Sequence, residues 1–558
     1  MLIFTSILLF INLSNQLSPL PDQRGICITP VIKQSTDQLN WDQIRLENRD
    51  YRLNEMLRVR PVVQVGDTKT FWSWDLSVMP PQWIQVPATC RAVGDSSYIF
   101  VADNCWNVHM DQVDVDTVIA HFEDHTLNNP DWGIVQLDVQ HFGDIPDEID
   151  NDRHVYIFYS ALGSYQGTAF DGYFSAYNQM TEAQAQAVGA HSNEVEMFYM
   201  TCYPLNPSAP QRLSVLAHEL EHMIHWNMDE DEDIWVDEGC AEMAMWLYGL
   251  PDPISGFPSQ PDNDLTQWDQ QWADYIQTYL FMMYLHDQYG GSDMVKTLVA
   301  ESLNGIQGVE QALQTMGYSE NFKQIFSNWT VANFINDTLY DQGQYGYYNL
   351  VLPSFNSILH SNYPVDVSGA KVNSWGTDYI HFINGRELSF IFDGADNTEF
   401  SMPVIMFTAG LDSVMVVSLD SVNYAQLFLP GFGSEFDHAV LAVSRTLSSG
   451  DSLYDYFADA LPVGVAEQPP LYRTSSFHYY VNENSTTLKV LWLNPVPGNL
   501  QCRIVDVSGR ILINELFNIR TSGTYHIELN IEDLTAGKYF LVLNLNKSIS
   551  TESFSVVR

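Results

Sequence analysis

The sequence predicts a multidomain protein in which an α+β domain is followed by all-β sandwich domains. The chain has 558 residues, which allows three to four domains at about 150 residues each. Apolar periodicity typical of helices is confined to about 210–335, after β-like runs nearer the N-terminus. From about 370 the helical period disappears, and short β-branched and aromatic runs alternate with turn residues, as in a sandwich.

The composition excludes several classes of protein. Hydrophobic residues make up 46% of the chain and charged residues only 17%, which argues against a disordered chain or a coiled coil. Lys and Arg number 24 against 69 Asp and Glu, and the resulting charge of −45 would repel the phosphates of nucleic acids. No cluster of Lys or Arg is present that could bind an anionic membrane. We therefore expect no nucleic-acid partner and no polybasic membrane anchor.

The first element is an apolar run at residues 1–11, followed by the polar stretch 12–16. This is the pattern of a secretory signal peptide, although no Lys or Arg precedes the run; the alternative is a buried N-terminal strand. The run is too short to cross a bilayer, and no later stretch reaches about 18 uncharged apolar residues. We predict a signal peptide at 1–18, no transmembrane segment, and a protein that is secreted or attached to the cell surface.

An N-terminal extension and a β-rich region are predicted for residues 19–125. Residues 19–60 show only weak periodicity, and the sequence leaves open whether they form a propeptide. Thr70–Trp74 and Tyr98–Val101 have the aromatic and β-branched character of short strands.

The six cysteines allow disulfides if the protein is exported. Their pairing cannot be read from the sequence. Cys90 and Cys105 each follow a short strand candidate, with turn-like residues between them, and are the favoured pair. Cys27 has no lipid-attachment motif in front of it, and neither Cys202 nor Cys240 stands in a nucleophile motif.

A metal-binding helix is the main feature of the domain predicted at 126–345. Apolar residues recur three and four apart over 213–224, which indicates an amphipathic helix. His218 and His222 therefore project from one face about one turn apart, near enough to share a metal ion. Glu219 lies about 100° round the helix, where its carboxylate can act as general base on a metal-bound water without being a ligand.

Catalytic zinc takes three protein ligands and leaves one position for water, so a third ligand is sought downstream. Glu238 opens the next helical pattern and is the predicted third ligand, with Asp237 as the competing choice. Glu242 lies one turn further and is predicted to hydrogen-bond the free ring nitrogen of a ligand His. His225 and Glu221 face away from the pair by helical phase, and we assign them surface or packing roles.

Hydrolysis of a peptide bond creates an oxyanion, so a hydrogen-bond donor is expected beside the metal. Tyr275 and Tyr279 share one face of a predicted helix, and either could donate; the alternative is that both simply pack in a core. Tyr173 is a weaker candidate. Ser192–Glu194 with Met197–Met200 could form an edge strand on the substrate side.

An acidic turn at 144–152 is dense enough in carboxylates to suggest a structural calcium ion, but it lacks the Gly and terminal Glu of an EF-hand loop. A solvated acidic turn is the favoured interpretation. The carboxylates concerned are Asp144, Asp147, Glu148, Asp150 and Asp152.

Two β domains are predicted after the helices. Runs such as Leu388–Phe392 and Ala439–Ser444 are β-branched and aromatic, and they are separated by turn residues. A boundary rich in Asn, Ser and Thr follows at 482–487. We therefore predict a β-sandwich-like domain at 346–482 and a further β-sandwich at 483–558.

The residues around the His pair resemble a known family. His218-Glu-Leu-Glu-His222 followed by Trp235-Val-Asp-Glu238-Gly-Cys-Ala-Glu242 looks like the gluzincin metallopeptidases, in particular the hyicolysin-like neutral zinc proteases. The resemblance covers about 65–345 and includes Gly172–Phe174 and Ser192–Glu194. It implies a zincin-like fold, a bound Zn²⁺ and endopeptidase activity, and it gives ligand roles to His218, His222 and Glu238 with Glu219 as base. Cys240 stands where an aliphatic residue is expected.

The tail resembles a second family. Asn494–Asn499, Ile504–Arg510, Leu534–Phe540 and Ser553–Arg558 look like the C-terminal sorting domain used by type IX secretion. The resemblance implies recognition by the type IX secretion machinery and export across a Gram-negative outer membrane, often with removal of the domain and attachment to the cell surface. The alternative is a plain β-sandwich adhesin module.

The leading hypothesis is a secreted zinc metalloendopeptidase that acts on a protein or peptide substrate through metal-activated water. The runner-up is a surface binding or adhesion protein whose metalloprotease-like domain is inactive. An intact Glu219 argues against the runner-up, because a purely structural zinc site has no use for a base. A serine esterase is not supported, since the sequence has no G-x-S-x-G motif.

Overall fold

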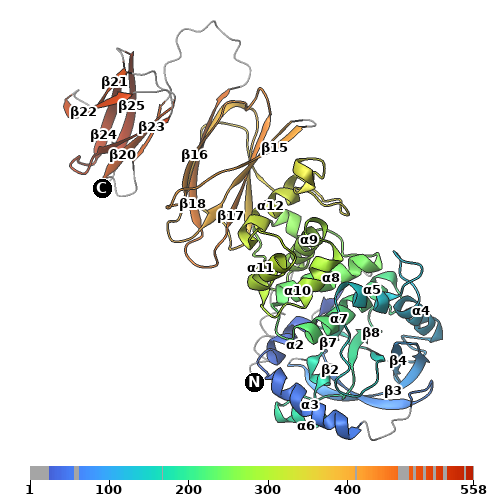
Figure 1. Ribbon diagram of the computed structural model, residues 1–558. Coiled ribbons are helices and arrows are strands. Elements are labelled where there is room, and N and C mark those ends of the chain that lie inside the picture. Colours follow the sequence, from blue (N-terminus) through green and yellow to red (C-terminus); the bar gives the residue numbers. More distant parts are fainter. Residues whose placement is uncertain are drawn as a thin grey trace. The chain divides into compact units, whose positions relative to one another are not determined.

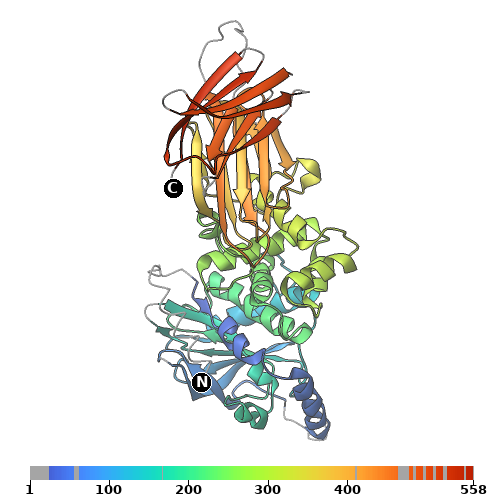
Figure 2. The same ribbon diagram turned by 90° about the vertical axis from the view of Figure 1, so that its left-hand side faces the viewer.

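The computed structural model describes residues 24–55, 62–78, 80–165, 168–408, 411–462, 477–481, 486–493, 498–506, 510–519, 524–545 and 548–556. The predicted signal peptide at 1–18 lies outside these residues. The chain divides into two compact units, Met1–Val463 and Gly464–Arg558, which we describe separately. The first unit holds a mixed sheet, a group of helices and a β-sandwich, and the second is all-β (Figures 1 and 2).

A mixed sheet with strand order β1-β7-β8-β5-β4-β3-β2 begins the first unit. Its central strands, β4 (Ser97–Ala102), β5 (Val155–Ser160) and β8 (Met197–Thr201), run parallel and are buried throughout, which fits their continuous apolar and aromatic sequences. β2 (Thr68–Asp75) and β3 (Gln82–Val93) continue the sheet antiparallel on one side.

The other side of this sheet carries the strands nearest the candidate site. β7 (Thr168–Phe174) runs antiparallel to β8, and the short β6 (Ser164–Tyr165) pairs with the start of β7. β1 (Ile26–Cys27) lies outermost and pairs parallel with β7. The N-terminal part continues into α2 (Thr29–Thr36) and α3 (Trp41–Glu55).

Helices cover the sheet and connect it to the sandwich. α4 (Gln112–Glu123), α5 (Ile134–His141), η1 (Ala176–Gln179) and α6 (Glu182–Ala187) lie in the connections between strands. α7 (Pro210–Met228) packs between the sheet and α8 (Ile234–Tyr248), and α8 packs on α9 (Trp272–Gln288), as Figure 1 shows. η2 (Phe257–Ser259), α10 (Ser292–Val299), α11 (Gly305–Thr315), α12 (Phe322–Ile335) and η3 (Asp341–Gly343) follow.

A proline and a glycine explain where helix α7 begins and where helix α8 ends. Pro210 stands in the first turn of α7, where its missing N–H costs no hydrogen bond. α8 ends at Gly249, whose φ of +106° is in the left-handed region that favours glycine. Both helices are almost entirely buried, because α7 and α8 lie in the interior between the sheet and α9.

Two sheets form the sandwich of the first unit. One has the order β10-β18-β12-β16, with bounds Val365–Lys371, Leu453–Pro462, Gly385–Gly394 and Tyr424–Leu429. The other has the order β15-β14-β17-β11-β9, with bounds Leu411–Val416, Pro403–Thr408, His438–Arg445, Thr377–Phe382 and Ile358–His360, and β13 (Phe400–Ser401) pairs with β17. The hydroxyl of Tyr379 donates to the carbonyl of Thr330 in α12 at 2.6 Å, so the sandwich is packed onto the helices.

The second unit has two further sheets around its own core. β19 (Phe477–Val481), β20 (Thr487–Leu493) and β23 (Thr524–Asn530) form one sheet. β22 (Ile511–Ile519), β21 (Gly498–Asp506), β24 (Gly537–Leu545) and β25 (Ser548–Val556) form the other, in that order. Alternate residues of β21 and β24 point into the core, as the sandwich prediction requires.

The chain is therefore a multidomain mixed α/β protein with several β-sheets and a β-rich C-terminal region, as predicted. The predicted edge strand on the substrate side is wrong. Met197–Met200 belong to β8, which lies between β7 and β5. Ser192–Glu194 lie outside any strand, and the side chain of Asn193 instead accepts a hydrogen bond from the backbone N–H of Trp72 at 2.8 Å.

Candidate metal centre

Helix α7 places His218 and His222 side by side. Both side chains are buried, and their Nε2 atoms lie 3.1 Å apart. The two rings are perpendicular, with centroids 4.7 Å apart. Burial, and then the charge of Arg24, lowers the pKa of His218, which favours the neutral imidazole that a metal needs.

Helix α8 brings the carboxylate of Glu238 to the same point. Its Oε2 lies 3.6 Å from Nε2 of His218, and its Oε1 lies 3.4 Å from Nε2 of His222. The side chain is fully buried, and neither oxygen has a hydrogen-bond partner among the described residues. Burial raises the pKa of Glu238 to about 7, although His222 opposes the shift. An unpartnered buried carboxylate that faces two imidazole nitrogens fits a divalent cation.

The outer nitrogens of both imidazoles also face carboxylates. Nδ1 of His222 lies 2.8 Å from Oδ1 of Asp237, so Asp237 is on the side of the ring that faces away from the ligand atoms. Burial works to lower the pKa of His222, but Asp237 and Glu238 outweigh it and raise that pKa. Glu242 lies 3.4 Å from Nδ1 of His218, and its carboxylate is ion-paired with Arg24.

Glu219 lies next to the ligand atoms but outside the cluster that they form. It is fully buried, and its Oε2 accepts a hydrogen bond from Oγ1 of Thr29 at 3.2 Å, while its Oε1 has no partner among the described residues. Burial raises the pKa of this carboxyl group. Gly172 in β7 makes room for it, because a Cβ at that position would lie 3.0 Å from Oε1 of Glu219 and 2.7 Å from the carbonyl oxygen of Tyr199.

Tyr275 and Tyr279 both lie in α9 with buried hydroxyl groups that have no hydrogen-bond partner among the described residues. Burial raises the pKa of Tyr275, and Glu238 is the next largest cause. For Tyr279 the causes after burial are Glu242 and Asp252. The guanidinium group of Arg24, 3.0 Å from Nδ1 of His218, lies 5.0 Å from the ring centroid of Tyr275, which places Tyr275 on the side of the ligand cluster.

Two residues that the sequence analysis did not place at the site lie within it. The Sγ atom of Cys27 in β1 is 3.7 Å from Nε2 of His222, and one ligand atom each from Cys27, His218, His222 and Glu238 lie within 4.8 Å of one another. Arg24 forms ion pairs with Glu242 and Asp252. No local pattern marks either residue, because their partners lie about 200 positions later in the chain.

Other predicted site residues have structural roles. The hydroxyl of Tyr173 accepts a hydrogen bond from the N–H of Trp74 at 3.3 Å, and its ring stacks on Tyr199 with centroids 4.1 Å apart. Tyr173 is therefore a core residue. His225 and Glu221 are buried and face each other at 3.1 Å, but Oε2 of Glu221 also lies 4.0 Å from Nδ1 of His222, and Nδ1 of His225 lies 3.6 Å from Asp237. The prediction that both face away from the His pair is therefore wrong.

The acidic turn is partly buried, which the solvated-turn interpretation does not allow. Asp147 and Asp150 lie with Glu196 such that one oxygen from each is within 4.8 Å of the others. Asp150 and Glu196 are buried, and burial followed by Asp150 raises the pKa of Glu196 well above its ordinary value. Asp144, Glu148 and Asp152 are outside this group. The calcium ion suggested for the turn stays a prediction.

The favoured disulfide is wrong. All six cysteines are free thiols in the structure, and the thiol of Cys90 donates to the carbonyl of Ala92 at 3.3 Å. The thiol of Cys105 is hydrogen-bonded to that of Cys202, which lowers the pKa of Cys105 to about 7. The neighbour of Cys105 is therefore Cys202, which the fold brings next to it.

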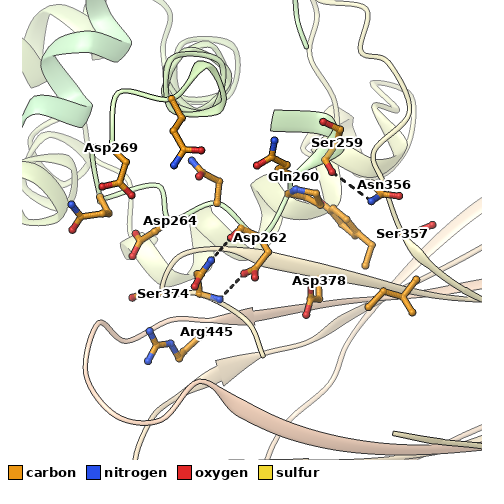
Figure 3. A pocket seen from close by; sticks show the side chains of 17 residues that line it. Ser259, Gln260, Asp262, Asp264, Asp269, Asn356, Ser357, Ser374, Asp378 and Arg445 are labelled. Carbon is orange, nitrogen blue, oxygen red and sulfur yellow. Dashed lines mark hydrogen bonds between the residues drawn. The ribbon is translucent and has the colours of Figure 1, made fainter. Parts of the chain in front are cut away.

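A separate cavity of about 600 Å³ lies in the first unit, between the loop at 259–271 and the sandwich (Figure 3). Asp262, Asp264, Asp378 and Arg445 line it. Oδ1 of Asp262 accepts a hydrogen bond from the N–H of Asn373 at 2.5 Å, and burial raises the pKa of Asp262 to about 7. Among the described residues, these carboxylates form no cluster with metal-ligand spacing.

Comparisons with known proteins give one family match and one curated relative. Residues 482–557 match the family described as "Secretion system C-terminal sorting domain". This confirms the predicted sorting tail, which serves secretion or cell-surface attachment through the type IX system. An alignment over 204 positions, which covers 31% of this chain and 44% of the relative, is 27% identical to the neutral metalloprotease ShpI of Staphylococcus hyicus. The chain thus spans less than half the length of that relative, and the similarity is consistent with a metalloprotease.

Similar solved structures include β-glucuronidases of Ruminococcus gnavus and Parabacteroides merdae. The first is 9% identical, with 32% of this chain and 35% of that chain covered and a TM-score of 0.16. The second is 11% identical, with 33% and 29% covered and a TM-score of 0.17. At such TM-scores the likeness carries no argument about fold or function. None of the described helices is both long and apolar enough to cross a membrane.

Proposed function

We propose that this protein is a secreted zinc-dependent endopeptidase with a zincin-like domain. The observation that carries the proposal is the buried Glu238, whose unpartnered oxygens face the Nε2 atoms of His218 and His222. These three residues would hold the metal. Two imidazoles and one carboxylate are a ligand set that suits catalytic zinc, because it leaves a position for water.

The chemistry divides among the groups around that cluster. A zinc ion bound there would lower the pKa of its water towards about 7 and polarise the scissile carbonyl group. Glu219 takes the proton of the attacking water and passes it to the leaving amine. Tyr275 donates its unpartnered hydroxyl to the developing oxyanion, and Asp237 fixes the orientation of the His222 ring. Similarity to a neutral metalloprotease supports the same reaction class.

The sorting tail supports the location of this activity. A domain for secretion or surface attachment implies that the substrate is met outside the cell. We infer a Gram-negative source, in which the type IX machinery recognises residues 482–557 and exports the enzyme.

Replacement of Glu219 tests the proposal. In the form isolated from the medium, Glu219→Gln should keep its zinc by metal analysis and lose hydrolysis of denatured casein by at least about a hundredfold. Glu435→Gln, at an exposed position of the sandwich, is the matched control and should retain activity. Hydrolysis by Glu219→Gln with zinc bound would overturn the base assignment. A wild type that binds zinc but stays inactive even after proteolytic removal of residues 24–36 would favour a surface binding protein.

A further inference from the structure

We propose that residues 24–36 are an inhibitory segment and that the Cys27 thiolate is the fourth ligand of the metal, so that the full chain is latent. The inference rests on the proposed function, and it assigns a role to a part of the chain that the catalytic mechanism does not use. Four sets of contacts support it. They concern the metal, the general base, the oxyanion donor and the place of the substrate.

The first set concerns the metal. Cys27 is fully buried, and its Sγ belongs to the same cluster as the ligand atoms of His218, His222 and Glu238. Three of these residues complete a catalytic ligand set, so the sulfur lies where the attacking water would otherwise bind. Thiolate is a favoured zinc ligand. When the thiol coordinates, the S–H proton passes to solvent, a metal–sulfur bond forms, and the metal-bound water is released.

The second set concerns the base. Thr29, two residues after Cys27, donates its hydroxyl to Oε2 of Glu219 at 3.2 Å. The same hydroxyl oxygen accepts the N–H of Phe174 in β7 at 2.9 Å, which fixes its direction. Glu219 is thereby hydrogen-bonded to the segment through the oxygen that also lies 3.7 Å from Sγ of Cys27.

The third set concerns the oxyanion side. The guanidinium group of Arg24 lies over the ring of Tyr275, 5.0 Å from its centroid, and 3.0 Å from Nδ1 of His218. Its side chain is 3% exposed and is ion-paired with Glu242 and Asp252. A buried Arg paired with two carboxylates is costly to withdraw, because both carboxylates would lose their partner. Arg24 therefore anchors the segment while it covers the tyrosine.

The fourth set concerns the substrate. β1 adds a parallel strand to the outer side of β7, where Ile28 donates its N–H to the carbonyl of Gly172 at 3.3 Å. An extended peptide binds such a sheet edge by the same backbone hydrogen bonds. The hollow between α2 and the site, which Thr29, Lys33, His222 and Asp237 help to line, measures only about 10 Å³. The segment thus fills the place of a bound peptide.

Activation then requires that the segment be separated from the rest of the chain. Residues 62–66, which precede β2, are open to proteases, because Val62 is 71% and Val65 is 65% exposed. A cut there leaves residues 24–36 attached by non-covalent contacts alone, so that they can dissociate.

A spectroscopic experiment tests the ligand directly. The full chain carrying Glu219→Gln, which prevents self-cleavage, is loaded with Co²⁺ in place of zinc. We expect a thiolate-to-cobalt charge-transfer band in the near ultraviolet, and we expect it to vanish in the additional variant Cys27→Ser while one metal per chain remains bound. Cys90→Ser, which replaces another buried cysteine, is the matched control and should keep the band. A band unchanged by Cys27→Ser would overturn the proposal.

An activity experiment tests latency. The uncut chain of Cys27→Ser should hydrolyse denatured casein at least about tenfold faster than the uncut wild type, which corresponds to about 1.4 kcal/mol of lost inhibitory contact. The wild type cut between α3 and β2 should reach a similar rate. If the uncut wild type is already as active as the cut form, the segment is not inhibitory. If no form binds metal or cleaves protein, the proposed function itself fails.

Discussion

The metal cluster and the large cavity of Figure 3 belong to the same unit but differ in every respect that matters for chemistry. The cavity holds about 600 Å³, whereas the hollow beside the cluster holds about 10 Å³. Asp262 in the cavity accepts a backbone hydrogen bond, whereas Glu238 in the cluster has no partner among the described residues. The comparison shows that clustered ligand atoms, rather than empty volume, identify the candidate site. Thr29, Ile32, Lys33 and Thr36 of the segment 24–36 line the hollow.

The largest loss of zinc and of activity is expected when a proposed metal ligand is replaced. A small loss would contradict the difference drawn between the cluster and the cavity. Glu238→Ala should lose bound zinc and reduce casein hydrolysis by at least about a thousandfold, because the remaining two imidazoles hold the ion poorly. Arg445→Ala in the large cavity should change the rate by less than about twofold. Metal analysis and rate measurements on both variants decide the matter. Equal losses in the two variants would contradict the assignment of the site.

The two tyrosines of α9 should respond differently to the loss of their hydroxyl groups. Tyr275→Phe should lower kcat by about a hundredfold to a thousandfold, since it removes the proposed donor to the oxyanion. Tyr279→Phe should change kcat by less than about fivefold, because its hydroxyl is not the proposed donor to the oxyanion. Steady-state kinetics at saturating substrate measure both. A larger loss for Tyr279→Phe would reverse the assignment.

Replacing Asp237, whose carboxylate faces Nδ1 of His222, should have a smaller effect on zinc binding. Asp237→Asn should weaken zinc binding by about tenfold to a hundredfold, because it no longer holds the ring of His222 as strongly. The check is zinc affinity by competition with a chelator. Asp264→Asn in the large cavity serves as the control, and zinc affinity that responds equally to both changes would argue against a specific role of Asp237.

The smallest effect on activity is expected for Asp138 in α5. This residue distinguishes the consequences of burying a carboxylate from those of binding a metal. Like Glu238 it is fully buried with both oxygens unpartnered among the described residues, but it belongs to no cluster of metal-ligand spacing. Burial, followed by Glu221, raises its pKa well above the ordinary value. The folded protein therefore binds a proton that the unfolded chain releases near pH 4. Stability should fall as pH rises from about 4 towards the raised pKa, by at most about 1.36 kcal/mol per pH unit.

Asp138→Asn should remove this part of the pH dependence and leave the zinc content unchanged. Urea unfolding midpoints between about pH 4 and pH 8 measure the slope, with the exposed Asp116→Asn as control. A slope that is the same in wild type and Asp138→Asn would show that Asp138 does not titrate between these limits.

Local spacing predicted the parts of the candidate site that lie on single helices. His218 and His222 come together because residues four apart share a helix face, and Glu238 follows from the next helical pattern. The sorting tail could be predicted because its turn and strand motifs are contiguous in sequence. Among the sheet-forming runs after residue 370, β12 shows the two-residue alternation of a sandwich strand over much of its length, whereas β17 is buried almost throughout.

Contacts across the sheet edge could not be predicted in this way. Cys27 meets its neighbours only because β1 pairs with β7, and a two-residue strand has no periodicity to reveal it. Cys105 meets Cys202, and Asp147 and Asp150 meet Glu196, for the same reason: each pair joins segments that are distant in sequence. Such contacts depend on tertiary structure, which residue spacing does not encode.

The covered position of Cys27 has a consequence for the organism that makes the protein. A protease that is catalytically competent from synthesis would threaten the proteins of its own cell during the journey to the outside. In the proposed enzyme, the residues that would silence it precede the helices of the candidate site in the chain, and the residues that direct export follow them. Digestion would begin only after departure, when the first part is trimmed, so that the producing cell is spared.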